Sequence, residues 1–324
     1  MPAFLHCFGA YVPERIVTNQ EIGARVGKEP AWIESVSGIR ERRWAAPEIS
    51  VADLAVAAAR DCLRNASVEA STLGMIVVAS GSGARGFPGP AATVAAHLGL
   101  EGTPALDVPM ASAGSLFGLV LASRMVEAYG DVLVIGAEKM SAAIETHAEG
   151  ASNNVPLDPS TAILFGDGAG AALVSSRPPQ LDANKRCWEI LDAVLHTDGQ
   201  FRDDLAWDGS SALRMNGLSV IMQAARKIPA AISEVLARQN VAATDVQAFL
   251  LHQANQNLLV RVAKTLGVPP ERVVSNVARY GNTSSASMLI AAAEWARENP
   301  PAGNVVFAAF GAGFHWGALL ARSC

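Results

Sequence analysis

Charged residues are scarce in this sequence, and basic residues are not in excess. Of its 324 residues, 17% are charged and 50% are hydrophobic, and the formal net charge is −5. A surface that binds nucleic acid non-specifically needs a basic field, so an acidic chain argues against that partner. No segment reaches the roughly 18 consecutive apolar residues that span a membrane. We therefore expect a compact protein with a large core and with neither nucleic acid nor a membrane as a partner.

Cysteine and targeting signals are also sparse. The first ten residues lack a basic stretch followed by a long apolar one, so we expect no secretory signal peptide. The four cysteines, at positions 7, 62, 187 and 324, are too far apart for metal-ligand spacing or a dense disulfide framework. We interpret them as reduced structural thiols and predict a cytoplasmic protein without a metal site.

The length and the order of segments predict two α/β halves, 1–175 and 176–324. In the first half we expect strands at 74–80, 105–108 and 132–138, a strand hairpin at 162–174, and helices at 51–64, 91–98 and 114–129. In the second half we expect strands at 248–251, 273–277 and 305–310, and helices at 213–238, 256–266 and 285–298. The helix at 114–129 is made of small and apolar residues, which predicts burial on all sides, and 141–160 should be irregular. The repeated order of strand, polar turn and small-residue helix indicates a duplicated unit with one site between the halves.

Residues 81–90 are rich in glycine and proline, which suggests a loop that could cradle a phosphate. The loop lacks the lysine of a P-loop and the G-x-G-x-x-G spacing, so we do not expect a nucleotide site there.

Three polar side chains follow strand-like runs and precede helix starts, where open α/β sheets build their sites. Ser112 follows 105–108, His252 follows 248–251, and Asn282 follows 273–277. From the residues alone, Ser112 could be a helix N-cap or a nucleophile. His252 could be a core histidine or a base that deprotonates Ser112, if the two lie within about 3 Å.

Six short segments form a distinctive set in this chain. They are residues 9–14 (GAYVPE), 29–33 (EPAWI), 37–42 (SGIRER), 165–171 (FGDGAGA), 252–255 (HQAN) and 281–284 (GNTS). With them the sequence resembles the β-ketoacyl-(acyl carrier protein) synthase III family of condensing enzymes over essentially its whole length. The resemblance implies an α/β thiolase fold, with duplicated βαβαβαββ halves in five αβαβα layers, and a homodimer. It also implies a Cys-His-Asn site that accepts an acyl group and condenses it with a malonyl thioester.

The sequence departs from the family pattern at four positions. Ser112 stands where the family has its nucleophilic cysteine. Val36, Pro159 and Asn257 stand where the family tends to carry arginines for pantetheine phosphates or the carrier protein. Ordinary carrier recognition is therefore in doubt.

The resemblance also implies a role for each residue at the reaction centre. Ser112 would accept the acyl group, and His252 and Asn282 would donate hydrogen bonds to the malonyl thioester carbonyl as charge develops. The backbone N–H groups of Ser112 and Ala312 would form the oxyanion hole. Phe310 would be a wall near the malonyl carboxylate, or simply core packing.

The substrate-binding roles belong to residues farther from the reaction centre. Trp32 would stack on the adenine of coenzyme A, and Arg40, with Arg42 and Arg43, would meet phosphates unless these arginines form only a solvated face. Phe87 would reach into the acyl pocket of the neighbouring subunit. Asp167, between two glycines, would be a structural turn.

We therefore predict an acyltransferase that takes an acyl group from acyl-CoA onto Ser112 and condenses it, with decarboxylation, with a malonyl thioester. Acyl-CoA and possibly acyl carrier protein are the expected partners, and no cofactor is expected. One alternative is acyl transfer to oxygen or nitrogen, or thioester hydrolysis, without decarboxylation. Others are a catalytically inactive partner subunit, or a chain in which cysteine was changed to serine to trap a complex.

Overall fold

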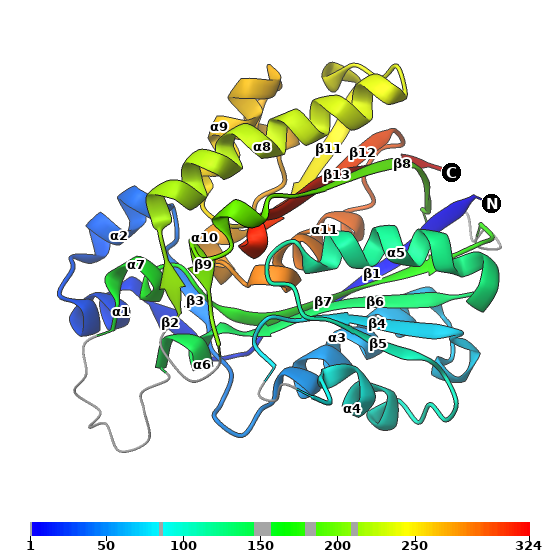
Figure 1. The fold of residues 1–324 in the computed structure, drawn as a ribbon, viewed down its shortest axis with the longest axis horizontal. Helices are drawn as coiled ribbons and strands as arrows, with labels where there is room; N and C mark the ends of the chain where they lie inside the picture. The colour runs from blue at the N-terminus through cyan, green and yellow to red at the C-terminus, as the bar shows by residue number, and fades with distance from the viewer. Residues whose placement is uncertain (1, 84–86, 146–156, 179–185, 209–212) are drawn as a thin grey trace.

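Nine strands form one continuous sheet at the centre of the molecule (Figure 1), in a computed structural model that describes residues 2–83, 87–145, 157–178, 186–208 and 213–324. In chain order the strands are β1 (Ala3–Tyr11), β4 (Met75–Ala79), β5 (Ala105–Val108), β6 (Val132–Lys139), β7 (Asp167–Ser175), β8 (Trp188–Thr197), β11 (Val246–Leu251), β12 (Asn304–Gly311) and β13 (His315–Ser323). Two short antiparallel pairs of strands lie outside this sheet, β2 (Ile16–Thr18) with β3 (Glu41–Arg43) and β9 (Leu205–Ala206) with β10 (Arg214–Met215).

The strand order shows the duplication that the sequence predicts. The first half runs β5-β4-β6-β7-β1 across the sheet, and the second runs β11-β12-β13-β8. An isolated parallel bridge between Phe249 and Val273 adds a short stretch to the outer side of β11. The five strands of the first half thus lie in the order third, second, fourth, fifth, first, and the second half has the same order if the bridge at Val273 takes the third place. The halves join where Ala3–Leu5 of β1 pair with residues 188–190 of β8.

The helices complete five layers, as Figure 1 shows from top to bottom. α8 (Gly217–Arg238) and α9 (Gln256–Leu266) cover the second half, and α3 (Val51–Ala66) and α4 (Pro90–His97) cover the first. α5 (Gly114–Tyr129) and α11 (Ser287–Arg297) pack between the halves against strands of both. The shorter helices are α1 (Asn19–Val26), α2 (Pro30–Ser37), α6 (Met140–Glu145), α7 (Pro159–Ala162) and α10 (Val277–Tyr280). Within the described ranges, no helix is long and apolar enough to cross a membrane.

Most predicted elements are confirmed to within a few residues, but two are wrong and one is wrong in part. The segment 141–160, expected to be irregular, is helical at both ends, in α6 and α7, while 146–156 lie outside the described residues. The segment 162–174 is not a hairpin; it contains one buried strand, β7, between β1 and β6. Its glycines suggested a turn, but in the structure they allow α11 to lie close to the strand. A Cβ on Gly170 would be only 2.6 Å from Cβ of Leu289. The segment 273–277 is not a strand, because only Val273 pairs and the chain then turns into α10.

Two predictions about burial and one about a helix start also need correction. α5 is not buried on all sides, since Leu121 and Tyr129 are exposed on its outer face. Asp167 is not a turn residue but a buried acceptor, which receives hydrogen bonds from the backbone of Ala45 and from Ser141. Burial raises the pKa of Asp167 to about 6. The helix predicted at 213–238 begins only at Gly217, because Arg214 and Met215 form β10.

Two of the four cysteines form a disulfide, so the prediction of four reduced thiols is wrong. Cys187 and Cys324 are bonded across a sequence separation of 137 residues. They meet because β8 and β13 are antiparallel, which brings the start of one beside the end of the other. Cys7 and Cys62 remain free thiols, with their sulfur atoms 3.5 Å apart.

Candidate active site

Ser112 lies in the short connection between β5 and α5, near the centre of the molecule. Its side chain does not cap α5, because the N-cap residue is Ala113 and no side chain caps this helix end. The N-cap interpretation is therefore wrong. Ser112 is buried, and its hydroxyl oxygen lies 3.4 Å from the hydroxyl oxygen of Ser284.

His252 follows the last residue of β11, and two contacts fix its position. Its backbone N–H donates to Ala308 O over 2.9 Å, and its ring Nδ1 lies 2.6 Å from Ser287 Oγ. Burial lowers the pKa of His252 to about 4, against a smaller opposing effect of the Ser284 carbonyl. The imidazole is therefore neutral at pH 7. No hydrogen bond joins it to Ser112 in the structure, so the contact expected of a base for this hydroxyl is not formed.

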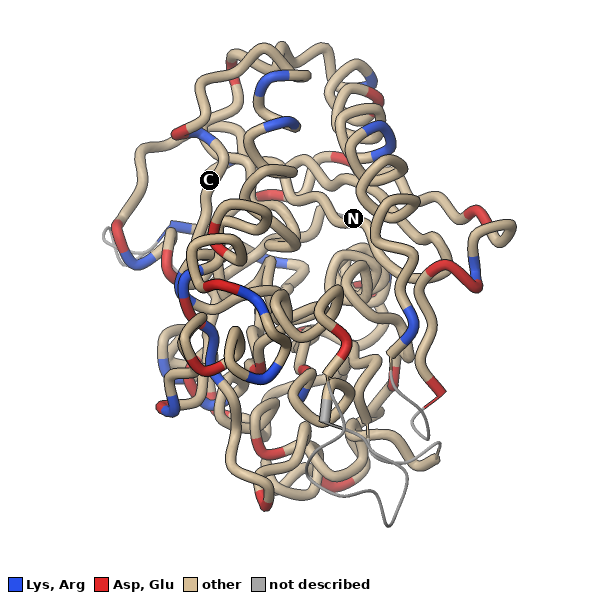
Figure 2. The backbone as a smooth tube through the Cα atoms, turned by 90° about the vertical axis from the view of Figure 1, so that its left-hand side faces the viewer, with Lys and Arg blue, Asp and Glu red and all other residues tan. Residues whose placement is uncertain are grey.

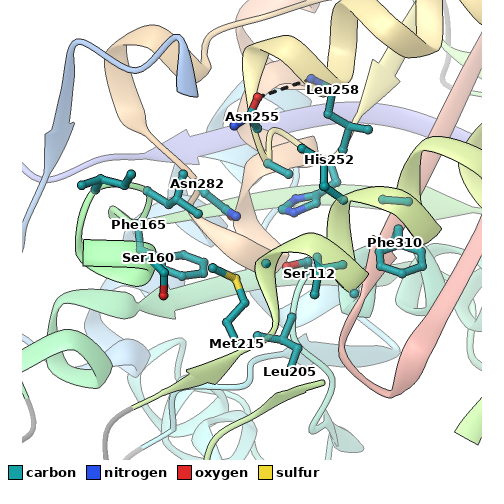
Figure 3. A pocket seen from close by; sticks show the side chains of 18 of the residues that line it. Ser112, Ser160, Phe165, Leu205, Met215, His252, Asn255, Leu258, Asn282 and Phe310 are labelled. Carbon is teal, nitrogen blue, oxygen red and sulfur yellow. Dashed lines mark hydrogen bonds between the residues drawn. The ribbon is translucent and has the colours of Figure 1, made fainter. Parts of the chain in front are cut away.

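Asn282 reaches the same region from the turn before α11. Its Oδ1 accepts from the backbone N–H of Ser284 over 2.9 Å. Its own backbone is held by Leu164 O and the N–H of Gly166, in a parallel bridge beside Phe165. Because the amide oxygen is engaged, the amide NH₂ is the group that points toward His252 and Ser112 (Figure 3). Among the described residues, none accepts from that NH₂.

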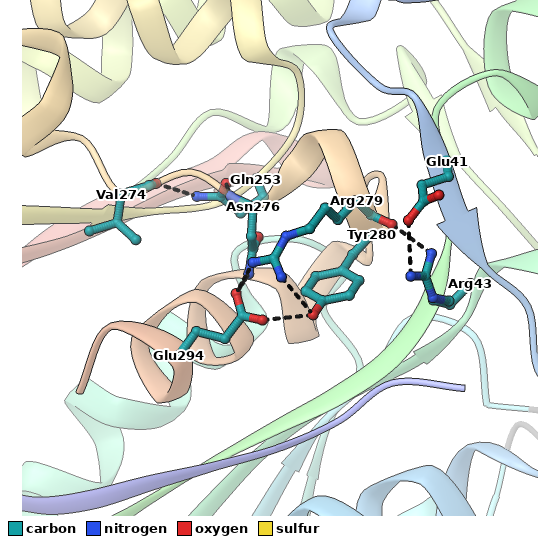
Figure 4. A network of polar contacts seen from close by, with 8 residues as sticks. All are labelled: Glu41, Arg43, Gln253, Val274, Asn276, Arg279, Tyr280 and Glu294. Atoms are coloured by element: carbon teal, nitrogen blue, oxygen red, sulfur yellow. Dashed lines mark hydrogen bonds and ion pairs between the residues drawn. The ribbon is translucent and has the colours of Figure 1, made fainter. Parts of the chain in front are cut away.

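The polar segment between β11 and α11 is held rigidly by hydrogen bonds (Figure 4). The amide of Gln253 donates to Leu251 O and Val274 O and accepts from the N–H of Asn276. Glu294 of α11 accepts from Asn276, Arg279 and Tyr280. These contacts fix the relative positions of the turns that carry His252 and Asn282.

A cavity of about 220 Å³ brings the three residues together, and it is largely apolar. Ser112, His252 and Asn282 lie at its inner end, and Phe310 forms part of the wall (Figure 3). Phe310 is also packed in the core, with its ring 4.7 Å from that of Phe314. The remaining lining comes mainly from α8, α9 and the segment before β7, including Val36, Phe165, Met215, Val220, Ala224 and Leu258.

A second cavity, of about 280 Å³, meets the first at Ser112. Its lining includes Ser112, Ala312, Glu138 and His315. Ala312 follows β12 and opens a short 3-10 turn, Ala312–Phe314. Gly311 passes close to the Ser112 backbone, since a Cβ there would lie 3.2 Å from Ser112 N and 2.8 Å from Ala113 N. In the described residues, no acceptor is recorded for the backbone N–H of Ser112 or Ala312.

Trp32, Arg40 and Phe87 lie outside both cavities. Trp32 is half-exposed on α2, with Lys28 Nζ 5.2 Å from its ring centroid, and Arg40 is exposed in the loop after α2. Phe87 is 91% exposed. The structure therefore groups Ser112, His252, Asn282, Phe310 and Ala312, and leaves these three at the surface.

The prediction that Arg42 meets phosphates is wrong. Its guanidinium is buried and donates to Asn19 and to the carbonyl of Ile163, and burial lowers its pKa to about 10. Arg43 is paired with Glu41 (Figure 4). Figure 2 shows basic and acidic residues interspersed on the side that carries α1 and α2.

Sequence reasoning missed three polar residues of the site: Ser284, Ser287 and Glu138. The two serines lie in the same turn as Asn282, within a serine-rich run that could have drawn attention. Glu138 is a charged residue that follows the apolar residues 132–137 of β6, and it is fully buried. That combination was the available signal, because a buried carboxylate needs specific partners.

Comparison with known proteins gives a consistent result over the whole chain. Residues 106–199 match the family model of 3-oxoacyl-[acyl-carrier-protein (ACP)] synthase III, and residues 236–323 match the model of its C-terminal part. A β-ketoacyl-[acyl-carrier-protein] synthase III from Oleidesulfovibrio alaskensis is 36% identical, with 98% of this chain and 97% of the relative covered. One from Rhodospirillum rubrum is also 36% identical, with 97% of each covered.

Solved structures of ketosynthases have the same fold as this chain. The 3-oxoacyl-(acyl carrier protein) synthase III of Pseudomonas aeruginosa superposes with a TM-score of 0.88 at 33% identity, covering 99% of this chain and 98% of the other. A priming β-ketosynthase of a polyketide biosynthetic pathway gives 0.84 at 31% identity, covering 99% and 96%.

Proposed function

Because the chain belongs to the 3-oxoacyl-[acyl-carrier-protein] synthase III family of condensing enzymes, we propose that it moves an acyl group from acyl-CoA to Ser112. The acyl group would then be condensed, with loss of CO₂, with a malonyl thioester, so that Ser112 takes the place of the family's nucleophilic cysteine. The observation that supports this most strongly is the common cavity of Ser112, His252 and Asn282, with the amide NH₂ of Asn282 free to donate.

Acyl transfer is supported by the surroundings of Ser112. The hydroxyl attacks the thioester carbon, and the backbone N–H groups of Ser112 and Ala312 stabilise the oxyanion of the tetrahedral intermediate. Gly311 keeps this approach open, because it places no Cβ against the Ser112 backbone. Coenzyme A leaves as its thiolate, and the acyl group remains on Ser112 as an ester.

Decarboxylation would use the other two side chains. Loss of CO₂ from a malonyl thioester leaves an enolate, whose oxygen needs hydrogen-bond donors. The amide NH₂ of Asn282 is one donor. Ser287 Oγ already accepts from the N–H of Gln253, so its proton is available to His252 Nδ1. In that tautomer, His252 presents Nε2–H as the second donor.

Substrate entry is best assigned to the side of the first cavity near α2. Val36 lines the cavity and Trp32 lies on the same helix, where it would stack on adenine. Arg40 is exposed in the loop that follows this helix. Asn257 donates to the carbonyls of Ser35 and Val36, so it ties α9 to α2. This entrance would therefore offer fewer charged contacts to the phosphates of coenzyme A than an entrance lined by arginines.

Intact-mass spectrometry after incubation with acyl-CoA tests the proposal. We expect a mass increase equal to one acyl group on the wild-type chain, and none on Ser112→Ala. Ser112→Cys should be acylated at least as fast, because a thiolate is the better nucleophile at neutral pH. An acyl adduct on Ser112→Ala would place the nucleophile elsewhere. No adduct on the wild-type chain would favour a non-catalytic partner subunit.

A further inference from the structure

A buried carboxylate lies two contacts away from Ser112. The hydroxyl oxygens of Ser112 and Ser284 are 3.4 Å apart, and Ser284 Oγ donates to Glu138 Oε1 over 3.1 Å. All three residues line the second cavity. The chain of contacts thus runs from the end of β6, through the turn before α11, to the connection before α5.

The direction of these contacts follows from the number of protons. A serine hydroxyl has one proton, and that of Ser284 is used in the bond to Glu138. Ser284 can therefore only accept from Ser112, so the Ser112 hydroxyl points its proton toward Ser284. The contact of 3.4 Å is long, as hydrogen bonds at a site without bound substrate often are.

Glu138 is surrounded by donors but not by cations. Its carboxylate accepts from Ser82 Oγ over 2.5 Å, and from Ser80 Oγ and Gly81 N–H over 3.3 and 3.1 Å. In the described part of the chain, no ion pair to Glu138 is recorded. Burial raises the pKa of Glu138, so this carboxylate is a better proton acceptor than an exposed one.

Ser284 is held in a backbone conformation that favours this arrangement. Its φ of 49° lies in the left-handed region, which a serine rarely adopts. Its N–H donates to Asn282 Oδ1, which fixes the turn. Such strain persists where the surrounding structure enforces it, and it is common at functional sites.

We propose that Ser284 and Glu138 form a proton relay that activates Ser112, while His252 and Asn282 serve the malonyl thioester. The inference rests on the proposed function, in which Ser112 accepts the acyl group. It also supplies a proton acceptor for a hydroxyl that makes no hydrogen bond to His252.

The proton balance closes over the catalytic cycle. As the Ser112 oxygen bonds to the thioester carbon, its proton passes to Ser284, and the proton of Ser284 passes to Glu138. The carbon–sulfur bond then breaks, and coenzyme A leaves as a thiolate. In condensation the enolate carbon attacks the acyl ester, the bond to Ser112 breaks, and Glu138 returns the proton through Ser284.

The experiment measures acylation rates by rapid-quench mass spectrometry, with acyl-CoA as the probe. We expect Ser284→Ala and Glu138→Gln each to slow acylation of Ser112 by about 10²-fold, because each removes one step of the relay. Ser80→Ala is the matched control, since it removes a hydroxyl from the other side of the same carboxylate, away from Ser112. Its effect should stay within about 3-fold.

The decisive comparison uses Ser112→Cys as background. A thiolate forms without the relay, so adding Ser284→Ala there should change the acylation rate by less than about 3-fold. Equal losses in the serine and cysteine backgrounds would show a structural role and overturn the relay. Wild-type acylation that is unaffected by Ser284→Ala would overturn it as well. Failure of the wild-type chain to be acylated would instead refute the proposed function.

Discussion

The amide of Asn282 offers the sharpest test of decarboxylation at the scale of single residues. Its oxygen is engaged by the Ser284 N–H, so only the NH₂ can reach the enolate. An ionised carboxylate cannot donate a hydrogen bond. We therefore predict that Asn282→Asp slows CO₂ release from a malonyl thioester by about 10²–10³-fold, while Ser112 is still acylated. CO₂ release and intact mass are measured on the same samples.

Equal loss of both activities in Asn282→Asp would contradict this division of roles. CO₂ release that is unchanged would move the assignment toward acyl transfer without decarboxylation. Asn240→Asp is the matched control, because Asn240 is exposed after the end of α8 and is not among the residues that line either cavity.

Burial of His252 makes stability depend on pH. Its pKa is lowered from 6.5 to about 4, so the unfolded chain binds a proton between these values that the folded chain does not. The folded state therefore loses stability as pH falls from about 6.5 to about 4, by about 3 kcal/mol from this group. The pKa values of Asp167 and Glu138 are raised by burial. These two groups therefore stabilise the folded state more as pH falls through the acidic range.

The difference between wild type and His252→Gln isolates the histidine. We measure denaturant unfolding of both proteins at pH 7 and pH 4.5. The free energy of unfolding of wild type minus that of His252→Gln should be smaller at pH 4.5 than at pH 7. A difference that is unchanged or larger at pH 4.5 would mean that His252 is protonated in the folded state.

At the scale of elements, the end of β12 and the start of α5 must approach closely. Gly311 lies against the backbone of Ser112 and Ala113. We predict that Gly311→Ala destabilises the protein by about 1–3 kcal/mol through overpacking. It should also slow acylation of Ser112 more than the loss of stability explains, because the added methyl group displaces an oxyanion-hole donor.

Gly199→Ala is the control for this substitution, since nothing lies within 4 Å of a Cβ at that position. Melting temperature and acylation rate are measured for both variants. Gly311→Ala with a wild-type acylation rate would show that the Ser112 backbone does not need this close approach.

At the scale of the whole molecule, the sheet has an open edge at β5, and β6 lies inside the sheet. β6 is flanked by β7 and β4, whereas residues 105–108 of β5 pair on one side only and are available to pair with another chain. Ala105 and Leu106 are exposed, and the start of α4, shortly after Phe87, is held to this strand by the hydrogen bond from Ala91 N–H to Asp107 Oδ1. Pairing of β5 with its copy across a two-fold axis would cover the edge and continue the sheet.

We predict a homodimer in light scattering at micromolar concentration, and dissociation to monomers by Leu106→Glu. A charge at the exposed edge opposes strand pairing with its own copy. Thr103→Glu, outside β5, should leave the dimer intact. A monomeric wild-type protein would refute the prediction, and with it the placement of Phe87 in a neighbour's pocket.

The sequence by itself determined the duplicated α/β architecture, the positions of Ser112 and His252 after strands, and the position of Asn282 in the turn before a small-residue helix. Such features are local, because a run of apolar residues, a polar turn and a helix start can be identified within about twenty residues. The family resemblance added roles, but not distances.

Only the tertiary structure decided which groups surround Ser112. The contact with Ser284, the approach of Gly311 and the buried carboxylate of Glu138 join segments that are more than 140 residues apart or lie on different elements. The same reason explains the wrong predictions. Arg42 and Cys187 have ordinary sequence surroundings, and their burial and bonding depend on distant strands and loops that only folding brings beside them.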